Sequence, residues 1–206
     1  MEGLPPPRYA RAMCNLYRMR RATAEIARTF DATLSAPFEW NEDIYPRQTA
    51  PVIVSAHGER RLGPMRWGFP TEVPGKTKML TKHVTNARNL ASPLWRPSLK
   101  SRRCLVPFTQ FAEPAPGKDA QGRPAQHWFH IADQAIPAFA GLWRPSAQGP
   151  VFAFCTTEPN PLVAPLHPKA MPVVLAEAEQ ELWLTGTVEQ ALALQSPYPS
   201  QLMAVE

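Results

Sequence analysis

Residues 127–156, HWFHIADQAIPAFAGLWRPSAQGPVFAFCT, contain three short apolar runs separated by turn-forming residues. Pro, Gly and Ser lie around the ends of the runs, and aromatic residues recur within them. Short runs of this composition between turn signals are typical of β-strands. The segment therefore predicts three strands, at residues 127–132, 136–143 and 151–156.

The sequence on either side predicts further short elements of both kinds. Strand signals are runs bounded by turn residues, and helix signals are apolar residues at helical spacing or a helix-forming composition. The elements expected are a hairpin over residues 51–69, a helix over 19–30, one more candidate strand at 172–175, and short helices at 176–184 and 188–194. The fold class is therefore α+β, a β-rich single domain with mixed or antiparallel strands and a few short helices.

Proline is the outlier of the composition, with 25 residues among 206. This is more than twice its usual share of about 5%. Because proline lacks an amide donor and fixes φ, its abundance excludes a long-helix or coiled-coil protein and favours short strands, turns and loops. The 44% of hydrophobic residues supply a core of ordinary size, which argues against wholesale disorder.

One domain is expected over residues 13–206, because no internal repeat or linker divides the sequence. Residues 1–12, MEGLPPPRYARA, have three consecutive prolines and no periodic apolar pattern. We expect them to be a loose or misassigned extension. The polar stretch 115–125, APGKDAQGRPA, is expected to be a surface loop.

Charge and cysteine usage indicate the partner and the compartment. A formal net charge of +5 favours a polyanionic partner such as nucleic acid. Cys14, Cys104 and Cys155 are too few and too scattered for a disulfide framework or a paired zinc motif, so we expect reduced thiols, no metal and no cofactor. No apolar run approaches the ~20 residues of a membrane span, and no secretory signal is seen. We expect a cytoplasmic protein without membrane contact, and a monomer.

Cys14 directly follows a second methionine, Met13. If translation starts at Met13 and this residue is removed, Cys14 carries a free α-amine beside its thiol. An α-amine is partly neutral near pH 7.7–8.0 and is then nucleophilic. With an aldehyde, the amine would form an imine and the sulfur would close a five-membered thiazolidine ring. The alternative is that Cys14 is a small buried residue at the start of a strand.

Asn86 and Arg88 lie in a segment rich in basic residues. The asparagine amide both donates and accepts hydrogen bonds, and a guanidinium group matches the geometry of phosphate. Trp67, Trp95 and Phe111 are candidates for stacking on bases or wedging between them, although large aromatic residues are more often part of the core. For Asn86 and Arg88 the alternative is a turn with a solvated arginine.

Glu113 and His167 are the candidates for proton transfer. Glu113 has apolar neighbours on both sides, which raise the pKa of a carboxyl group and suit it to acid or base catalysis. His167 stands between prolines that restrict its backbone. An ordinary loop glutamate and a loop-capping histidine are the alternatives. His127 and His130 are three residues apart in an expected strand, hence on opposite faces, and do not predict a metal site.

Seven motifs occur in a characteristic order. They are Met-Cys-Asn-Leu-Tyr at 13–17, Arg-Trp-Gly-Phe-Pro at 66–70, Asn-Ala-Arg at 86–88, Arg-Cys-Leu-Val-Pro at 103–107 followed by Glu113, Phe-Ala-Gly-Leu-Trp at 139–143, Thr-Thr at 156–157, and His-Pro-Lys-Ala-Met-Pro at 167–172. This set resembles the SOS-response-associated peptidase (SRAP) family of abasic site processing proteins, over nearly the whole chain.

The resemblance implies a DNA-repair activity and assigns roles to the candidate residues. Cys14, as an N-terminal residue, would crosslink to the ring-opened aldehyde of an abasic site in single-stranded DNA. Asn86 would orient the reacting groups, Glu113 and His167 would transfer protons, and Arg88 would contact phosphate. The family association also implies a peptidase, an enzyme of the hydrolase class, with autoproteolytic activity.

The chain departs from the family pattern at three positions, where it has Leu16, Pro114 and Ala170. Its start also matters, because Cys14 has a free amine only if translation begins at Met13 or if autoproteolysis removes residues 1–13. Two other functions stay open: a cysteine peptidase without a role on DNA, and a noncatalytic protein that binds single-stranded DNA.

Overall fold

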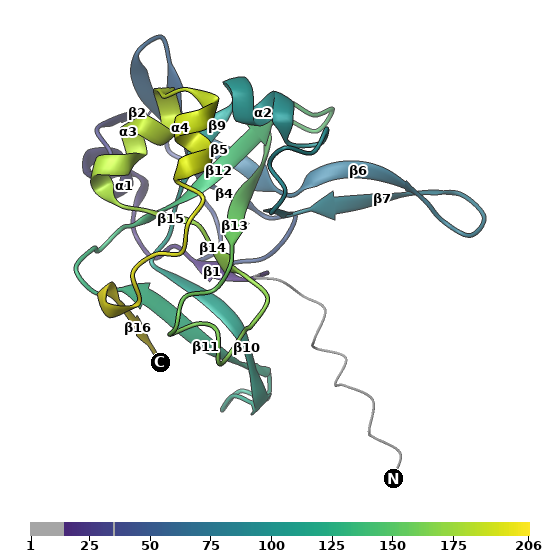
Figure 1. Ribbon diagram of the computed structural model, residues 1–206, viewed down its shortest axis with the longest axis vertical. Coiled ribbons are helices and arrows are strands. Elements are labelled where there is room, and N and C mark those ends of the chain that lie inside the picture. Colours follow the sequence, from purple (N-terminus) through teal and green to yellow (C-terminus); the bar gives the residue numbers. More distant parts are fainter. Residues whose placement is uncertain (1–14, 35) are drawn as a thin grey trace.

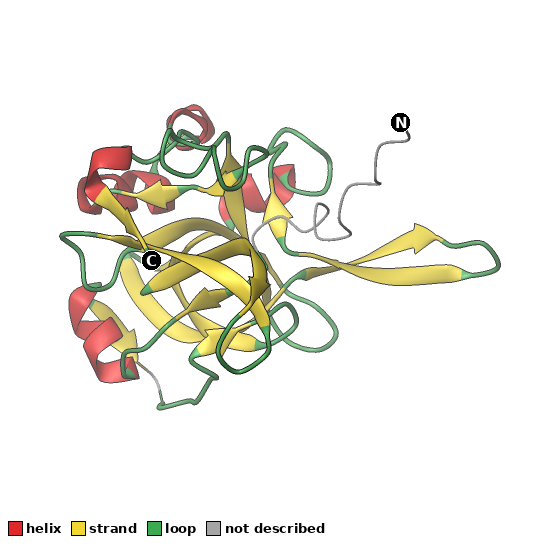
Figure 2. Cartoon of the chain, turned by 90° about the horizontal axis from the view of Figure 1, so that it is seen from below, coloured by secondary structure: helices red, strands yellow, loops and turns green. Residues whose placement is uncertain are grey.

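The computed structural model describes residues 15–34 and 36–206. Strands curve around a central core, and short helices lie outside them (Figures 1 and 2). The strands form a large curved sheet, a five-stranded sheet and a separate two-stranded ribbon. The predicted α+β class, rich in strands and built as one domain, is confirmed.

The large sheet is nine-stranded and closes on itself. Its closure comes from β5, which pairs with β4 on one edge and, in parallel, with β13 on the other. The strands of this sheet are β2 (Ala32–Leu34), β4 (Thr49–Ala56), β5 (Glu59–Trp67), β8 (Asn86–Ala87), β9 (Arg103–Pro107), β12 (Ala138–Arg144), β13 (Val151–Thr157), β14 (Met171–Pro172) and β15 (Val174–Leu175).

The five-stranded sheet has the order β16-β11-β10-β1-β3 and carries much of the candidate site. Its strands are β1 (Tyr17–Arg18), β3 (Asp43–Ile44), β10 (Gln110–Lys118), β11 (Pro124–Ile131) and β16 (Met203–Val205). The remaining strands, β6 (Phe69–Pro74) and β7 (Met79–Val84), pair only with each other and project from the body (Figure 1).

Aromatic side chains join the two larger sheets into one core. Tyr17 from β1 meets the ring of Trp67 edge-on, with 5.2 Å between centroids. Phe139 from β12 stacks on Phe108 at 3.8 Å, and Phe111 from β10 packs against the edge of Phe139. Full burial of one such side chain contributes about 1.5–3 kcal/mol, so this cluster holds the sheets in a fixed arrangement.

The strand predictions over residues 127–156 and the hairpin prediction are confirmed, with shifted ends. The observed strands are β11, β12 and β13, and the hairpin consists of β4 and β5. His57 and Gly58 form its two-residue turn with φ values of 54° and 79°. Positive φ at both positions matches the right-handed twist of the flanking strands. The candidate strand at 172–175 is divided between β14 and β15.

The helix expected over residues 19–30 is shorter, and its first part is wrong. Helix α1 covers only Thr23–Thr29. The Met19 N–H donates to the carbonyl of Glu42, and the Met19 carbonyl accepts from the Trp40 indole. These partners hold the backbone of Met19 outside the helix, although its side chain is buried as the apolar pattern predicts.

The two C-terminal helices are confirmed as α3 (Glu177–Thr185) and α4 (Val188–Ala193). Thr187 begins α4, where its hydroxyl accepts from the backbone N–H of Gln190. The other helices are α2 (Arg96–Ser101) and the short 3-10 helix η2 (Ser200–Leu202). None of the helices in the described parts of the chain is long and apolar enough to cross a membrane.

The surface loop expected at residues 115–125 is wrong for most of its length. β10 and β11 continue their pairing as far as Lys118 and Pro124, with a register shift on the way. The turn itself is held by Asp119, whose carboxylate accepts from the backbone N–H and from the guanidinium group of Arg123. The polar and proline residues therefore extend a hairpin, and this hairpin forms a wall of the site.

Alkaline pH is expected to destabilise the fold through two buried thiols. Burial raises the pKa of the Cys104 and Cys155 thiols above their ordinary value of 9.0. Above that pH the unfolded chain loses thiol protons that the folded chain keeps. The contribution of the thiols is thus complete below about pH 8, and the free energy of unfolding falls by roughly 3 kcal/mol between pH 8 and 10.

Urea unfolding at several pH values measures this loss. The Cys104→Ala/Cys155→Ala variant is the comparison, because it removes both titrating groups. We expect its free energy of unfolding to fall less steeply with pH, whatever its starting value. Equal slopes in the two proteins would contradict the assignment.

Candidate functional site

A groove of about 1460 Å³ lies along the β10–β11 hairpin. Its lining includes the hairpin from Pro114 to Trp128, the loop from Pro165 to Lys169, and Asn15 and Leu16. The charged and aromatic residues that line it are Arg18, Asp43, Tyr45, Lys118, Asp119, Arg123, Trp128 and Lys169. Since small-molecule pockets are usually about 300–1,000 Å³, a groove of this size fits an extended ligand.

The nucleophile predicted at Cys14 lies outside the described residues. Asn15, which follows it directly in the chain, is exposed and lines the groove. The described part of the chain therefore begins at the groove, one residue after the predicted nucleophile.

Glu113 is fully buried in β10, so the alternative of an ordinary loop glutamate is wrong. Strand alternation puts it on the same face as Phe111, which stacks on Phe129. A carboxylate in such surroundings is costly unless a polar partner faces it. His167 is such a partner, since its Nδ1 lies 3.4 Å from Oε2 of Glu113.

His167 is held at the groove by its backbone and by its ring. Its N–H donates to the carbonyl of Val163, and its Nδ1 lies 2.8 Å from the carbonyl oxygen of Ala170. Because a carbonyl oxygen only accepts, Nδ1 carries the proton in this contact, and Nε2 of the neutral ring is an acceptor. The imidazole thus has a fixed tautomer, a carboxylate beside it and a nitrogen that can accept a proton.

Asn86 lies beside β13 and is not among the residues that line the groove. It forms β8 with Ala87 and pairs in parallel with Phe154, and its side-chain amide donates to the Thr85 hydroxyl at 3.0 Å. The same strand, β13, pairs two residues further on with β14, which follows the His167 loop in the chain. The C-terminal half of β13 therefore connects the segments that carry Asn86 and His167.

Thr156 is a candidate site residue that the sequence reasoning did not single out. It lies on this part of β13, on the same face as Phe154, and its buried hydroxyl has no hydrogen-bond partner within the described ranges. An unsatisfied buried hydroxyl costs about 1–3 kcal/mol, which makes Thr156 a candidate for a bond to a ligand group, although it is not among the residues that line the groove. The only signal in the sequence was its place in the Thr-Thr motif.

Arg88 is exposed beside the site and is already paired with an acid. Its guanidinium lies 3.4 Å from Glu158, and its carbonyl accepts from the amide of Gln195. The pKa of Glu158 is lowered by its own backbone N–H, by the Thr157 hydroxyl and by Arg88. An exposed ion pair contributes at most about 1 kcal/mol, so Arg88 can exchange this carboxylate for a phosphate.

The stacking role expected for Trp67, Trp95 and Phe111 is corrected by their burial. All three side chains belong to the hydrophobic core. Trp67 stacks on Phe154, and its indole N–H donates to the carbonyl of Thr85 next to Asn86. Trp95 packs against Phe69 with 4.8 Å between centroids. Trp67 and Trp95 support the site from within, and none of the three presents a free ring face to a base.

The groove has aromatic and imidazole groups of its own. Trp128 lines it, with the Arg18 guanidinium 3.3 Å above its ring. His127 lies directly opposite Glu113 in the β10–β11 register and also lines the groove. Both lie in the strand predicted at residues 127–132, but the sequence reasoning assigned neither of them to the site.

The three departures from the family pattern have identifiable places. Leu16 is buried, and its carbonyl accepts from the N–H of Ala112. Pro114 lines the groove, while Ala170 holds His167 through a backbone carbonyl that any residue supplies. Within residues 15–34 and 36–206, no group of His, Cys, Asp and Glu is arranged to hold a metal ion.

Comparisons with known proteins agree with this geometry. The family described as SOS response associated peptidase (SRAP) matches residues 13–206. The abasic site processing protein YoaM of Bacillus subtilis (strain 168) is 28% identical over 185 residues, covering 84% of this chain and 79% of the relative. The abasic site processing protein YobE of the same organism is 25% identical over 182 residues, covering 84% and 82%.

Solved structures have the same fold. A crystal structure of a protein from Bordetella bronchiseptica aligns with a TM-score of 0.73 at 26% identity, covering 93% of this chain and 98% of the other. A protein from Bacteroides thetaiotaomicron shares the fold, with a TM-score of 0.74 at 19% identity over 93% of this chain and 90% of the other.

Proposed function

The chain belongs to the SOS response associated peptidase (SRAP) family, and we propose that it crosslinks covalently to abasic sites in single-stranded DNA. The observation that carries this proposal is the contact between His167 and the fully buried Glu113, beside a groove large enough for an extended ligand. The names of the relatives, which are abasic site processing proteins, support abasic DNA as the partner.

The proposed reaction joins Cys14 to the aldehyde of the ring-opened sugar. The free α-amine of Cys14 attacks the aldehyde carbon, and loss of one water leaves an imine. The thiol then adds across the C=N bond, so that a C–S bond forms and the thiol proton passes to nitrogen. The product is a thiazolidine, formed with the release of one water in total.

Glu113 and His167 serve the proton transfers of this sequence. One proton must leave the amine and another must reach the departing oxygen, and a carboxylate next to an imidazole can exchange protons in both directions. His167 has Nε2 available as an acceptor, and the side-chain amide of Asn86 can hydrogen-bond the opened sugar.

The peptidase activity is the second part of the proposal. In a chain that begins at Met1, the Cys14 thiol attacks the carbonyl of Met13, which gives a thioester and frees the α-amine. Water then hydrolyses the thioester and releases residues 1–13. This autoproteolysis uses the same nucleophile and prepares it for the crosslink.

A denaturing gel tests the crosslink directly. Protein that starts at Met13, and separately the chain from Met1, is mixed with single-stranded DNA that carries one abasic site. We expect a heat-stable band whose mass is the sum of protein and DNA less one water. A matched strand whose abasic aldehyde has been reduced to an alcohol is the control and gives no band.

Other outcomes separate the alternatives. If neither form gives the band but intact single-stranded DNA is bound in a salt-sensitive way, the protein is a noncatalytic binder. If neither form gives the band and an unrelated peptide is turned over without DNA, the protein is a cysteine peptidase without a role on DNA. Either result overturns the crosslinking proposal.

A further inference from the structure

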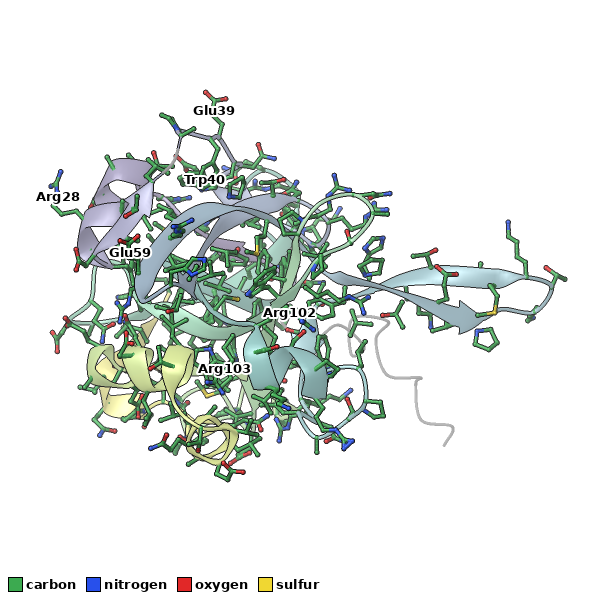
Figure 3. The ribbon with its side chains drawn as sticks, turned by 90° about the horizontal axis from the view of Figure 1, so that it is seen from above. Arg28, Glu39, Trp40, Glu59, Arg102 and Arg103 are labelled. Carbon is green, nitrogen blue, oxygen red and sulfur yellow. The ribbon has the colours of Figure 1, made fainter. Side chains whose placement is uncertain are left out.

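The ribbon of β6 and β7 stands apart from the rest of the fold. We call residues 69–84 the arm; its strands pair over six positions, from Phe69 with Val84 to Pro74 with Met79. Figures 1, 2 and 3 each show it extending well beyond the body. Among the described residues, no further strand pairs with this ribbon.

The root of the arm is firmly attached. Phe69 is buried against Trp95, and the Arg144 guanidinium lies 4.6 Å above the Phe69 ring while donating to the carbonyl of Pro70. Gly68 also donates its N–H to the carbonyl of Phe152 at 2.7 Å. These contacts with the core therefore fix the direction in which the arm projects.

The outer part of the arm is exposed and apolar in places. Met79 is 55% exposed and Leu80 is 44% exposed. An isolated two-stranded hairpin is only marginally stable in water, since neither of its faces is covered. A partner that covers the arm would therefore stabilise it.

The positive charge of the arm favours a polyanionic partner. Lys76, Lys78 and Lys82 are all exposed, and Glu72, the arm's single acidic residue in the sequence, accepts a 2.6 Å hydrogen bond from Thr81. Gly75 donates its N–H to the carbonyl of Lys78, and a Cβ at Gly75 would lie 2.5 Å from that oxygen. The tight tip that Gly75 permits carries Lys76 and Lys78.

The arm also lies next to Asn86 in the chain. β7 ends at Val84, and Asn86 follows two residues later. Six extended residues span about 20 Å. This equals the rise of roughly six base pairs at 3.4 Å each. Nucleic acid that reaches the site from this side would lie along the arm.

The composition of the arm distinguishes duplex from single strand. Proteins that bind single strands use aromatic side chains on which bases stack. Residues 70–84 contain no Phe, Tyr or Trp. A two-stranded ribbon, by contrast, has the width that the major groove of duplex DNA admits, and lysines contact phosphates of any sequence.

We propose that the arm binds duplex DNA flanking the single-stranded lesion, with the ribbon in the major groove and its lysines on phosphates. This inference rests on the proposed function, because it places the lesion at the groove and the duplex at the arm. The arm would accordingly strengthen binding when duplex DNA flanks the lesion.

The test uses the Lys76→Ala/Lys78→Ala/Lys82→Ala variant. Its matched control is Arg21→Ala/Arg28→Ala/Arg61→Ala, which removes the same charge from exposed residues, two of them on or beside α1 across the body from the arm (Figure 1). In Figure 3, Arg28 lies on the side opposite the arm. Binding is measured on three DNAs: a short single strand with one abasic site, that strand with a long single-stranded flank, and that strand with a duplex flank of about ten base pairs, longer than the arm.

We expect the arm variant to bind the duplex-flanked DNA roughly 10-fold more weakly and to lower the slope of log K against log salt by about 3, from three lost phosphate contacts. The short strand and the control variant should show no change. Equal losses on duplex and single-stranded flanks, equal losses in the control variant, or no loss at all would overturn the inference. Crosslinking of the short strand by the unmodified protein is measured separately. A failure of the proposed function is therefore distinguished from a failure of this inference about the arm.

Discussion

Replacing Cys14 with alanine is expected to abolish the heat-stable crosslink to abasic DNA. The α-amine remains in this variant and still forms an imine, but without the sulfur the five-membered ring cannot close. The imine hydrolyses on denaturation, so the band should fall to background. Borohydride, which reduces an imine to a stable amine, should restore it. A heat-stable band of normal intensity without reductant would exclude the thiazolidine.

The two other cysteines provide the matched control for this experiment. Cys104 and Cys155 are buried in the core, and burial raises the pKa of both thiols. The thiolate is the nucleophilic form, so neither thiol reacts in the folded protein. Cys104→Ala and Cys155→Ala should crosslink at the normal rate provided that they stay folded, which a urea titration checks.

Glu113→Gln is expected to slow crosslinking by about 10²–10⁴-fold, the usual contribution of a positioned acid or base. Glutamine keeps the size and shape of the buried side chain but cannot take up or release a proton near neutral pH. The affinity for intact single-stranded DNA should not change, because Glu113 is fully buried and contacts His167. Single-turnover rates and a binding titration separate the two effects.

Glu181→Gln makes the same chemical change on the exposed surface of α3 and serves as the control. A double variant, Glu113→Gln with His167→Ala, adds a further criterion. If the two groups act as one proton-transfer unit, the double variant is barely slower than the slower single variant. A normal rate in Glu113→Gln would reduce the carboxylate to a structural role.

The pair of Glu113 and His167 illustrates how far sequence reasoning reaches. The apolar neighbours of Glu113 and the prolines around His167 marked each residue, because local composition controls local solvation and backbone freedom. Nothing local indicated that the two side chains lie 3.4 Å apart. That distance depends on how the His167 loop packs against β10, two segments far apart in the chain.

The tryptophans illustrate the opposite case, in which the sequence suggested a role at the site and the structure shows burial in the core. Local composition allowed Trp67 and Trp95 a place at a DNA surface, although a core position is the commoner one for large aromatic side chains. Closure of the large sheet buries Trp67, and packing at the root of the arm buries Trp95. Among the rings that line the groove is that of Trp128, which the sequence did not distinguish from its neighbours.

By itself the sequence determined the strand-rich class, the single domain, the order of most elements and the residue types of the site. These follow from proline content, apolar periodicity and short motifs, which act over a few residues. Only the tertiary structure decided that residues 115–125 extend a hairpin wall, that three aromatic candidates are core, and that the arm projects from beside Asn86. Each of these depends on pairing and packing between distant segments, where the free energy comes from surfaces that no single stretch of sequence contains.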